Sequence, residues 1–199
     1  MARNIEIKAW IDGIERIEAL VATLARHGPE PIAQDDTFFQ CANGRLKLRA
    51  FSDTAGELIF YRRADQAGPK ESFYVRSSTT EPAVLRELLT LAHGQAGRVR
   101  KQRTLYLVGR TRVHLDRVEG LGEFLELEVV LRDGEPAEAG VAEAHALMAQ
   151  LQVSAGQLVE QAYVDLLAAQ ASVALSSGAS FATGLRYSTR AVSAFTKQV

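Results

Sequence analysis

Polar and apolar residues alternate with a period of two along several segments of the chain, which predicts β-strands. The segment NIEIKAW, at residues 4–10, is an example. Ile5 and Ile7 share one face of this strand and Glu6 and Lys8 share the other, because successive side chains point to opposite sides. The predicted strands cover residues 4–10, 36–40, 45–51, 57–63, 70–77, 97–108, 110–118 and 123–132.

Apolar residues recur with a period near 3.6 in other segments, which predicts helices. The first helix follows Asp12, which can cap it, and stops at Gly28. The second begins at Thr80, and the last begins with Ser154 and Gln157 in a capping-box pattern. Beyond the first, the predicted helices cover residues 80–94, 138–151 and 155–169.

The composition is that of a soluble globular protein, with 47% hydrophobic and 24% charged residues among 199. We predict one folded domain over residues 1–170. Residues 171–199 are rich in Ser and Ala and contain no acidic residue, which is typical of a flexible tail. A segment that binds a partner or a membrane surface is the alternative for this tail.

Charge and cysteine content exclude several classes of protein. The net charge of −1 gives no indication of binding to nucleic acid or to an anionic membrane. No apolar stretch reaches the roughly 18 residues that a membrane span needs. The single cysteine, Cys41, cannot form an intramolecular disulfide, and the N-terminus lacks the apolar segment of a signal peptide, so we expect a cytoplasmic protein.

Residues of one sign cluster on the polar faces of individual strands. Arg45, Lys47 and Arg49 share one such face, and Glu126 and Glu128 share another. A half-solvated antiparallel sheet, with water on its charged side, is one interpretation. However, a solvated face usually mixes signs, because like charges in neighbouring positions repel. The pattern therefore favours charged faces that meet an anionic ligand.

Carboxylates together with many basic residues indicate a polyanion with a bound divalent metal ion. Carboxylates supply oxygen ligands to Mg²⁺ or Mn²⁺, and Lys and Arg neutralise phosphate oxygens. Glu126 and Glu128 lie roughly 7 Å apart on one strand face, and sharing a cation would relieve their repulsion. We therefore expect the charged faces to point into a closed barrel and the apolar faces to lie outside it, under the helices.

Six sequence motifs resemble those of the CYTH family and occur in that family's order. They are NIEIK, GRLKLR, ELIFYRR, VRKQR, TRVHLD and FLELEV, and the resemblance runs from about residue 3 to residue 168. This family includes class IV adenylate cyclases, thiamine triphosphatases and inorganic triphosphatases, also called triphosphate tunnel metalloenzymes. The resemblance implies an α+β fold with a closed antiparallel eight-stranded β-barrel, or tunnel, and helices packed outside. It also implies a bound triphosphate and Mg²⁺ or Mn²⁺.

The resemblance implies roles for individual residues. Lys8 would bind phosphate or activate the attacking oxygen as a catalytic residue. Metal binding is implied for Glu6, Glu126, Glu128 and Asp116. Triphosphate binding is implied for Lys47, Arg49, Arg62, Lys70, Lys101, Arg103 and Arg112. For His114, which shares a strand face with Arg112 and Asp116, we expect a structural imidazole paired with a carboxylate.

Asn4 departs from the family pattern, because it replaces the first Glu of the ExExK signature. One charged metal ligand is thereby lost, so binding of a second ion is in question. Two reactions are compatible with the motifs: conversion of ATP to cyclic AMP and pyrophosphate, and hydrolysis of inorganic or thiamine triphosphate. A non-catalytic module that binds polyphosphate or a nucleotide is the alternative. We expect a small triphosphate as partner, with no nucleic acid and no membrane, and leave a homodimer open.

Overall fold

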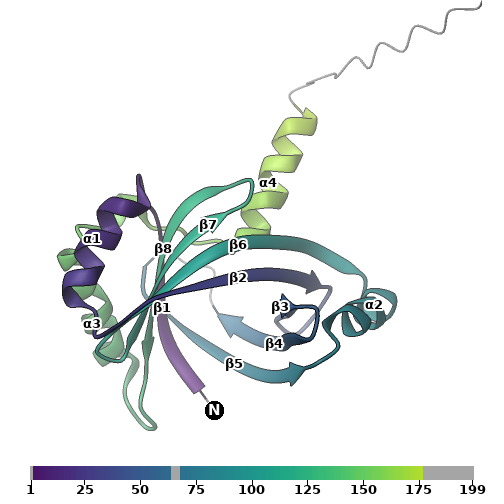
Figure 1. Ribbon diagram of the computed structural model, residues 1–199, viewed down its shortest axis with the longest axis horizontal. Helices are drawn as coiled ribbons and strands as arrows, with labels where there is room; N and C mark the ends of the chain where they lie inside the picture. Colours follow the sequence, from purple (N-terminus) through teal and green to yellow (C-terminus); the bar gives the residue numbers. More distant parts are fainter. Residues whose placement is uncertain (1, 64–67, 177–199) are drawn as a thin grey trace, which may run out of the picture.

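Eight antiparallel strands form a closed ring in the computed structural model, which describes residues 2–63 and 68–176 (Figure 1). The order around the ring is β1-β5-β4-β3-β2-β6-β7-β8, so β1 pairs with both β5 and β8. The tunnel-like α+β fold predicted from the sequence is therefore confirmed. The strands are β1 (Ala2–Trp10), β2 (His27–Phe39), β3 (Arg45–Ser52), β4 (Ala55–Arg63), β5 (Lys70–Thr79), β6 (Gln95–Val108), β7 (Thr111–Val118) and β8 (Gly122–Val130).

Helices flank the ring on opposite sides. Figure 1 shows α1 and α3 together on one side, α2 on the other, and α4 projecting away from the ring. The helical elements of the described residues are α1 (Ile14–Leu24), α2 (Pro82–His93), α3 (Ala137–Gln150), the 3-10 turn η1 (Ala155–Gln157) and α4 (Tyr163–Ser176).

The apolar faces of the strands point outward and are covered by these helices. Ile7 of β1 packs in one cluster with Ile17 of α1 and Leu147 of α3, and each is at most 5% exposed. On the other side, Leu89 of α2 packs against Leu48 of β3. Each such side chain contributes about 1.5–3 kcal/mol when it leaves water. The core therefore lies between ring and helices, and the inner faces of the strands are left for polar residues.

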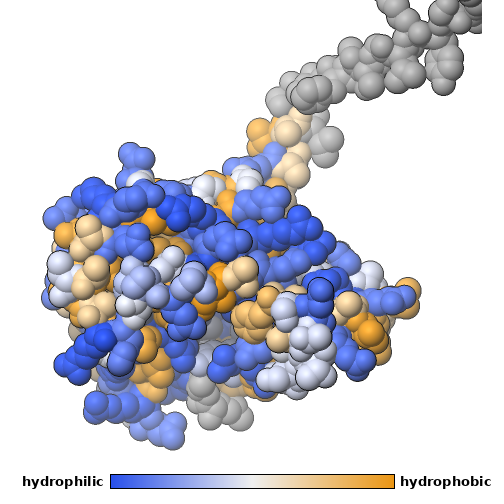
Figure 2. Space-filling view, viewed as in Figure 1, coloured by the Kyte–Doolittle hydropathy of each residue, from blue (hydrophilic) through white to orange (hydrophobic). Residues whose placement is uncertain are grey.

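The outer surface is mostly hydrophilic, as Figure 2 shows for the face seen in Figure 1. Apolar residues gather at the right of that view, over α2, where Val84, Leu88 and Leu91 are 58%, 56% and 82% exposed. Among the described helices, none has both the length and the apolar character that crossing a membrane requires.

The strand β2 is longer than the sequence predicts. It begins at His27, whereas the predicted strand begins only at residue 36. Pro29 and Pro31 lie in the missed half, and proline is unfavourable in a strand because it cannot donate to the ladder. β2 nevertheless pairs with β6 along this half.

The first helix is shorter than predicted and has a different cap. α1 ends at Leu24 rather than near Gly28. Asp12 does not cap it; the backbone N–H of Ile14 instead donates to the carboxylate of Glu123 at 2.8 Å. Glu123 lies on β8, so the cap also fixes α1 to the ring.

The last helix begins later than predicted. The capping box of Ser154 and Gln157 is present, but it opens only the short turn η1. The predicted helix at residues 155–169 is thus displaced to α4, which continues through residues 171–176 of the predicted tail. The remainder of that tail, residues 177–199, lies outside the described residues.

Candidate functional site

The ring encloses a cavity of about 360 Å³, lined by the inner faces of all eight strands. Its described lining includes eight Lys or Arg side chains and five carboxylates. This excess of cations suits an anionic ligand, because such a ligand offsets their mutual repulsion. Nine of the predicted site residues line this cavity, and their roles stay predictions: Glu6, Lys8, Lys47, Arg49, Lys101, Arg103, Arg112, Glu126 and Glu128.

Asp36 of β2 holds two of these cations in place. Its carboxylate accepts hydrogen bonds from Nζ of Lys47 and from Nε of Arg49, both at 2.7 Å. Burial alone would raise the pKa of Asp36, but Lys47 and Arg49 lower that pKa far below its usual range. Burial lowers the pKa of Lys47 to about 8, with Arg49 adding to the effect. The two basic side chains are therefore fixed in orientation before any ligand binds.

Asp116 of β7 orients a second pair of cations. This side chain is fully buried and accepts hydrogen bonds from Lys101 at 3.0 Å, from Nε of Arg103 at 2.6 Å and from the Tyr163 hydroxyl at 3.0 Å. Burial alone would raise its pKa, but Arg103 and Lys101 lower that pKa well below its usual range. Asp116 itself is not part of the cavity lining and lies behind Lys101 and Arg103, which are part of it.

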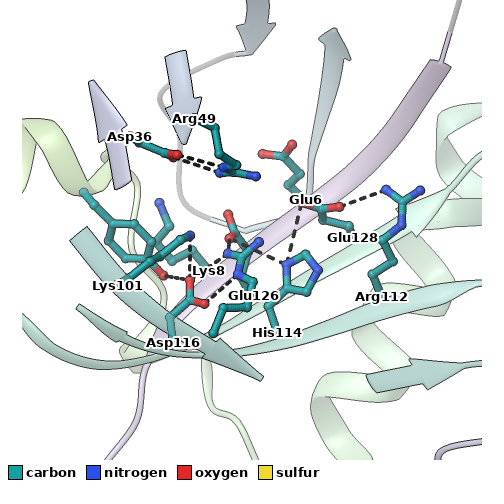
Figure 3. A network of polar contacts seen from close by, with 12 residues as sticks. Glu6, Lys8, Asp36, Arg49, Lys101, Arg112, His114, Asp116, Glu126 and Glu128 are labelled. Atoms are coloured by element: carbon teal, nitrogen blue, oxygen red, sulfur yellow. Dashed lines mark hydrogen bonds and ion pairs between the residues drawn. The ribbon is translucent and has the colours of Figure 1, made fainter. Parts of the chain in front are cut away.

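His114, Glu126 and Glu128 form a group that could hold a divalent ion (Figure 3). One possible ligand atom from each lies within 4.8 Å of the others. Glu126 and Glu128 are two positions apart on β8 and therefore share one face of the strand. His114 is the cross-strand neighbour of Glu126 on β7. Glu126 accepts a short hydrogen bond from Arg103, and Glu128 accepts one from Arg112 at 3.3 Å. These cations moderate the repulsion between the two carboxylates.

The donor atoms of this group fit a metal ion. Nδ1 of His114 is buried, and no hydrogen-bond partner for it occurs in the described part of the chain. Burial, followed by Arg103, lowers the pKa of His114, which keeps the imidazole neutral. Burial would raise the pKa of Glu126, but Arg103 lowers it well below its usual range. Neutral imidazole and ionised carboxylate are the protonation states that bind metals.

Glu6 lies beside this group, opposite Glu128 on the neighbouring strand, and is paired with a cation. Its carboxylate accepts a hydrogen bond from Arg63 at 3.1 Å. Burial, followed by Glu128 and Glu126, raises the pKa of Glu6. Asn4 shares the same face of β1, is 2% exposed, and its Oδ1 has no partner among residues 2–63 and 68–176. Metal binding by Glu6 stays a prediction.

Two residues predicted to bind triphosphate lie outside the cavity lining. Arg62 is exposed, and its Nε donates to the carbonyl of Asn43 at 2.8 Å. The prediction for Arg62 is therefore wrong in position, since Arg63 is the residue of β4 that lines the cavity. Lys70 is 2% exposed, and its Nζ donates to the carbonyl of Glu160 at 2.8 Å. This contact directs Lys70 to the segment before α4 rather than to the lining.

The segment that leads into α4 crosses one end of the ring. Besides the contact of Lys70, Nζ of Lys8 donates to the carbonyl of Gln161 at 3.1 Å. The ring of Tyr163 lies with its centroid 4.1 Å from the same Nζ. Burial lowers the pKa of Lys8 to about 7. Lys8, predicted to be catalytic, thus lies in the cavity at the end that this segment covers.

A larger hollow of about 770 Å³ lies between α2 and strands β2 and β6, and it shares Gln34, Phe51 and Lys101 with the lining of the cavity inside the ring. Several of its charged side chains pair with each other: Arg98 donates to Asp35 at 2.7 Å, and Arg100 lies 3.8 Å from Glu119. Because opposite charges compensate here, the cavity inside the ring is the stronger candidate for binding an anion.

The family of the chain follows from a comparison with known proteins. The sequence profile of the CYTH domain matches residues 2–163, so the chain belongs to the CYTH family. This confirms the resemblance carried by the six motifs.

Individual relatives share either sequence or fold. Adenylate cyclase CyaB of Aeromonas hydrophila is 25% identical over 160 residues, which cover 75% of this chain and 82% of that protein. The PH1012 protein of Pyrococcus horikoshii has a TM-score of 0.74 at 22% identity, over 82% of this chain and 99% of that one. HpAC1 of Hippeastrum, an adenylyl cyclase homologue described as having a dominant triphosphatase activity, has a TM-score of 0.57 at 16% identity, over 84% and 96%. At these identities the two structures show the common fold alone.

Proposed function

We propose that this chain is a metal-dependent enzyme that binds the triphosphate group of a small molecule inside the ring and cleaves a phosphoanhydride bond. One observation carries the proposal: a set of fixed cations and a metal-binding donor group face the same cavity. The fixed cations include Arg49 and Arg103, and the donor group consists of His114, Glu126 and Glu128. Membership of the CYTH family supports it.

The basic side chains would bind phosphate oxygens. Arg49, Arg103 and Arg112 reach the cavity from three different strands, so they can contact different phosphoryl groups of one ligand. Guanidinium groups bind phosphate through two parallel hydrogen bonds. Because Asp36 and Asp116 already orient several of the cations, little reorganisation is needed when negative charge develops in the transition state.

The group of His114, Glu126 and Glu128 would hold Mg²⁺ or Mn²⁺. When bound, such an ion supplies positive charge to the phosphate oxygens. Lys8 lies nearby as the cross-strand neighbour of Glu126, and its ammonium group would donate a hydrogen bond to the substrate. The segment before α4 limits access of water from that end of the ring.

Two reactions fit this arrangement. In the first, the 3′-hydroxyl oxygen of ATP bonds to the α-phosphorus, the bond to the bridging oxygen breaks, and pyrophosphate leaves with cyclic AMP as the other product. In the second, water attacks the terminal phosphorus of inorganic or thiamine triphosphate and orthophosphate is released. Both need in-line geometry and charge neutralisation. The curated relative CyaB favours the first reaction, and HpAC1 favours the second.

A substrate panel tests the proposal. The purified chain is incubated with ATP, inorganic triphosphate or thiamine triphosphate and Mg²⁺ or Mn²⁺, and cyclic AMP, pyrophosphate and orthophosphate are separated. We expect turnover of at least one compound, abolished by EDTA. Tight binding of a triphosphate without turnover would favour the non-catalytic module instead. Neither binding nor turnover of any compound would refute the proposal.

A further inference from the structure

The proposed metal site includes one nitrogen donor, His114, and the proposed function leaves open which atom of His114 binds the ion and which ion the site prefers. We infer that His114 binds the divalent ion through Nδ1, together with Glu126 and Glu128, and that this ligand set favours first-row transition ions over Mg²⁺. The inference rests on the metal-dependent function proposed above. Its tests measure the binding of metal ions rather than the turnover of a triphosphate.

The first argument is the unsatisfied state of Nδ1 of His114. The side chain is 5% exposed, and the atom makes no hydrogen bond within residues 2–63 and 68–176. Its separations of 3.9 Å from Oε2 of Glu126 and 3.8 Å from Oε1 of Glu128 are too long for hydrogen bonds. A buried polar atom without a partner requires an explanation, and an ion between these atoms supplies one.

The second argument is the spacing of the donor atoms. Ligands that lie ~2.1 Å from one ion are about 3.0 Å apart at right angles and about 4.2 Å apart when opposite. The separations of 3.9 and 3.8 Å at His114 lie inside this range. Nδ1 of His114 therefore lies at the spacing of two ligands of one ion from an oxygen of each glutamate.

The third argument is that neighbouring contacts hold the donors in this orientation. His114 and Glu126 are cross-strand neighbours in the β7–β8 ladder, so their backbones are fixed relative to each other. Glu128 accepts a hydrogen bond from Arg112 with Oε2, and its other oxygen, Oε1, is the one that faces His114. A hydrogen bond from a neighbouring residue commonly holds a metal ligand in its binding orientation.

The fourth argument concerns Glu6, the carboxylate opposite Glu128 on β1. Its Oε2 accepts a hydrogen bond from Arg63, a side chain only 4% exposed. The guanidinium thus already supplies a positive charge to Glu6. Among the described residues, the donor atoms that lie within 4.8 Å of one another come from His114, Glu126 and Glu128 and not from Glu6, so His114 supplies the third ligand.

A nitrogen ligand changes which ion the site selects. Mg²⁺ prefers oxygen ligands, whereas imidazole suits the later first-row metals, whose affinity rises from Mn²⁺ through Co²⁺ to Ni²⁺. A site of two glutamates and His114 is therefore expected to bind Co²⁺ and Mn²⁺ more tightly than Mg²⁺.

Pulsed electron paramagnetic resonance of Mn²⁺ bound to the full chain tests the inference directly. We expect a ¹⁴N coupling from one imidazole, replaced by a ¹⁵N coupling when histidine is labelled. His114→Gln should abolish the coupling. His145→Gln is the matched control, because His145 is exposed on α3 and should leave the coupling unchanged. A wild-type protein that binds Mn²⁺ without any nitrogen coupling would overturn the inference, whether or not the variants fold.

Equilibrium dialysis with Co²⁺, Mn²⁺ and Mg²⁺ tests the selectivity. His114→Gln should weaken Co²⁺ binding roughly tenfold or more, Mn²⁺ binding less, and Mg²⁺ binding within about twofold. An equal loss for all three ions would contradict the selectivity. Triphosphate turnover without nitrogen coupling would leave the proposed function intact and overturn the role of His114. Nitrogen coupling in a chain that turns over no triphosphate would overturn the proposed function and leave the metal site.

Discussion

The hydroxyl of Tyr163, at the start of α4, donates a hydrogen bond of 3.0 Å to Oδ2 of Asp116 on β7. Neither residue is more than 7% exposed. The same carboxylate orients Lys101 and Arg103. The last helix is therefore connected, through one buried carboxylate, to two of the cations that face the cavity.

This connection predicts a large effect of Asp116→Asn on stability. Loss of the charge leaves Lys101 and Arg103 buried with less compensation, and breaking a buried pair typically costs about 3–5 kcal/mol. The free energy of unfolding, measured by urea denaturation, should fall by that amount. Asp35→Asn is the control, because Asp35 pairs with the exposed Arg98 on the outer face and should cost less than about 1 kcal/mol. Equal losses for both variants would contradict the assignment.

Arg62 and Arg63 offer a matched pair of variants on β4. Arg63 lines the cavity and pairs with Glu6, whereas Arg62 is exposed and bonded to the carbonyl of Asn43. Arg63→Gln should raise the KM for the triphosphate about tenfold or more, as loss of a charge-assisted hydrogen bond does. Arg62→Gln should leave KM within about twofold. Steady-state kinetics of both variants decide the point, and a larger effect at Arg62 would refute the placement.

The carboxylates of β8 should be essential for turnover. Glu128→Gln removes one charged ligand, so kcat/KM should fall by on the order of 10². EDTA should abolish wild-type activity, and added Mn²⁺ should restore it. Glu71→Gln serves as the control, because Glu71 lies on β5 and pairs with Arg3 away from the cavity. Full activity in EDTA would exclude a metal requirement.

Lys47 should contribute to the loss of activity at alkaline pH. Burial, followed by Arg49, lowers its pKa to about 8, while Asp36 acts in the opposite direction. The protonated form would bind phosphate, so loss of this proton should lower kcat/KM as the pH rises through about 8, in addition to the decline expected from Lys8, whose pKa is about 7. Lys47→Arg keeps the charge at high pH, because guanidinium does not titrate there. The alkaline decline should therefore weaken in this variant, and an unchanged pH profile would assign the decline to another group.

Alternation along the strands indicated a closed ring and most of the charged residues that line it. Lys47 and Arg49, or Glu126 and Glu128, are separated by one apolar residue each, so their common direction follows from the period of two. Pro29 obscured the first half of β2 in the sequence, although that half pairs with β6.

Alternation does not identify the inward-facing residue where two adjacent residues carry the same charge. In Arg62-Arg63, either residue could face inward, because Phe60 and Tyr61 before them are both aromatic. Asp36, which follows Asp35, was ambiguous for the same reason. Its cross-strand position opposite Arg49 is the signal that would have identified it. Strand register is a long-range property, which a single sequence specifies only weakly.

The role of His114 could not be predicted from the sequence for a different reason. The sequence shows that it shares a face with Arg112 and Asp116, but not whether its nitrogen finds a partner across the ring. That depends on side-chain positions from β7 and β8 together, so the sequence favoured a structural imidazole paired with a carboxylate, whereas Nδ1 of His114 makes no hydrogen bond within the described residues.

The pairing of β1 has a consequence for how the chain folds. Asn4 of β1 is opposite Ser72 of β5 on one side and Val130 of β8 on the other. β1 precedes the other seven strands in the chain, but its pairing is complete only after β8 has been synthesised. Contacts between such distant positions form slowly, and until residue 130 has left the ribosome one edge of β1 has no native partner. The seam between β1 and β8 also brings Glu6 opposite Glu128. An incomplete chain therefore lacks the closed cavity, and a ligand that binds the finished cavity would stabilise the closing step of folding itself.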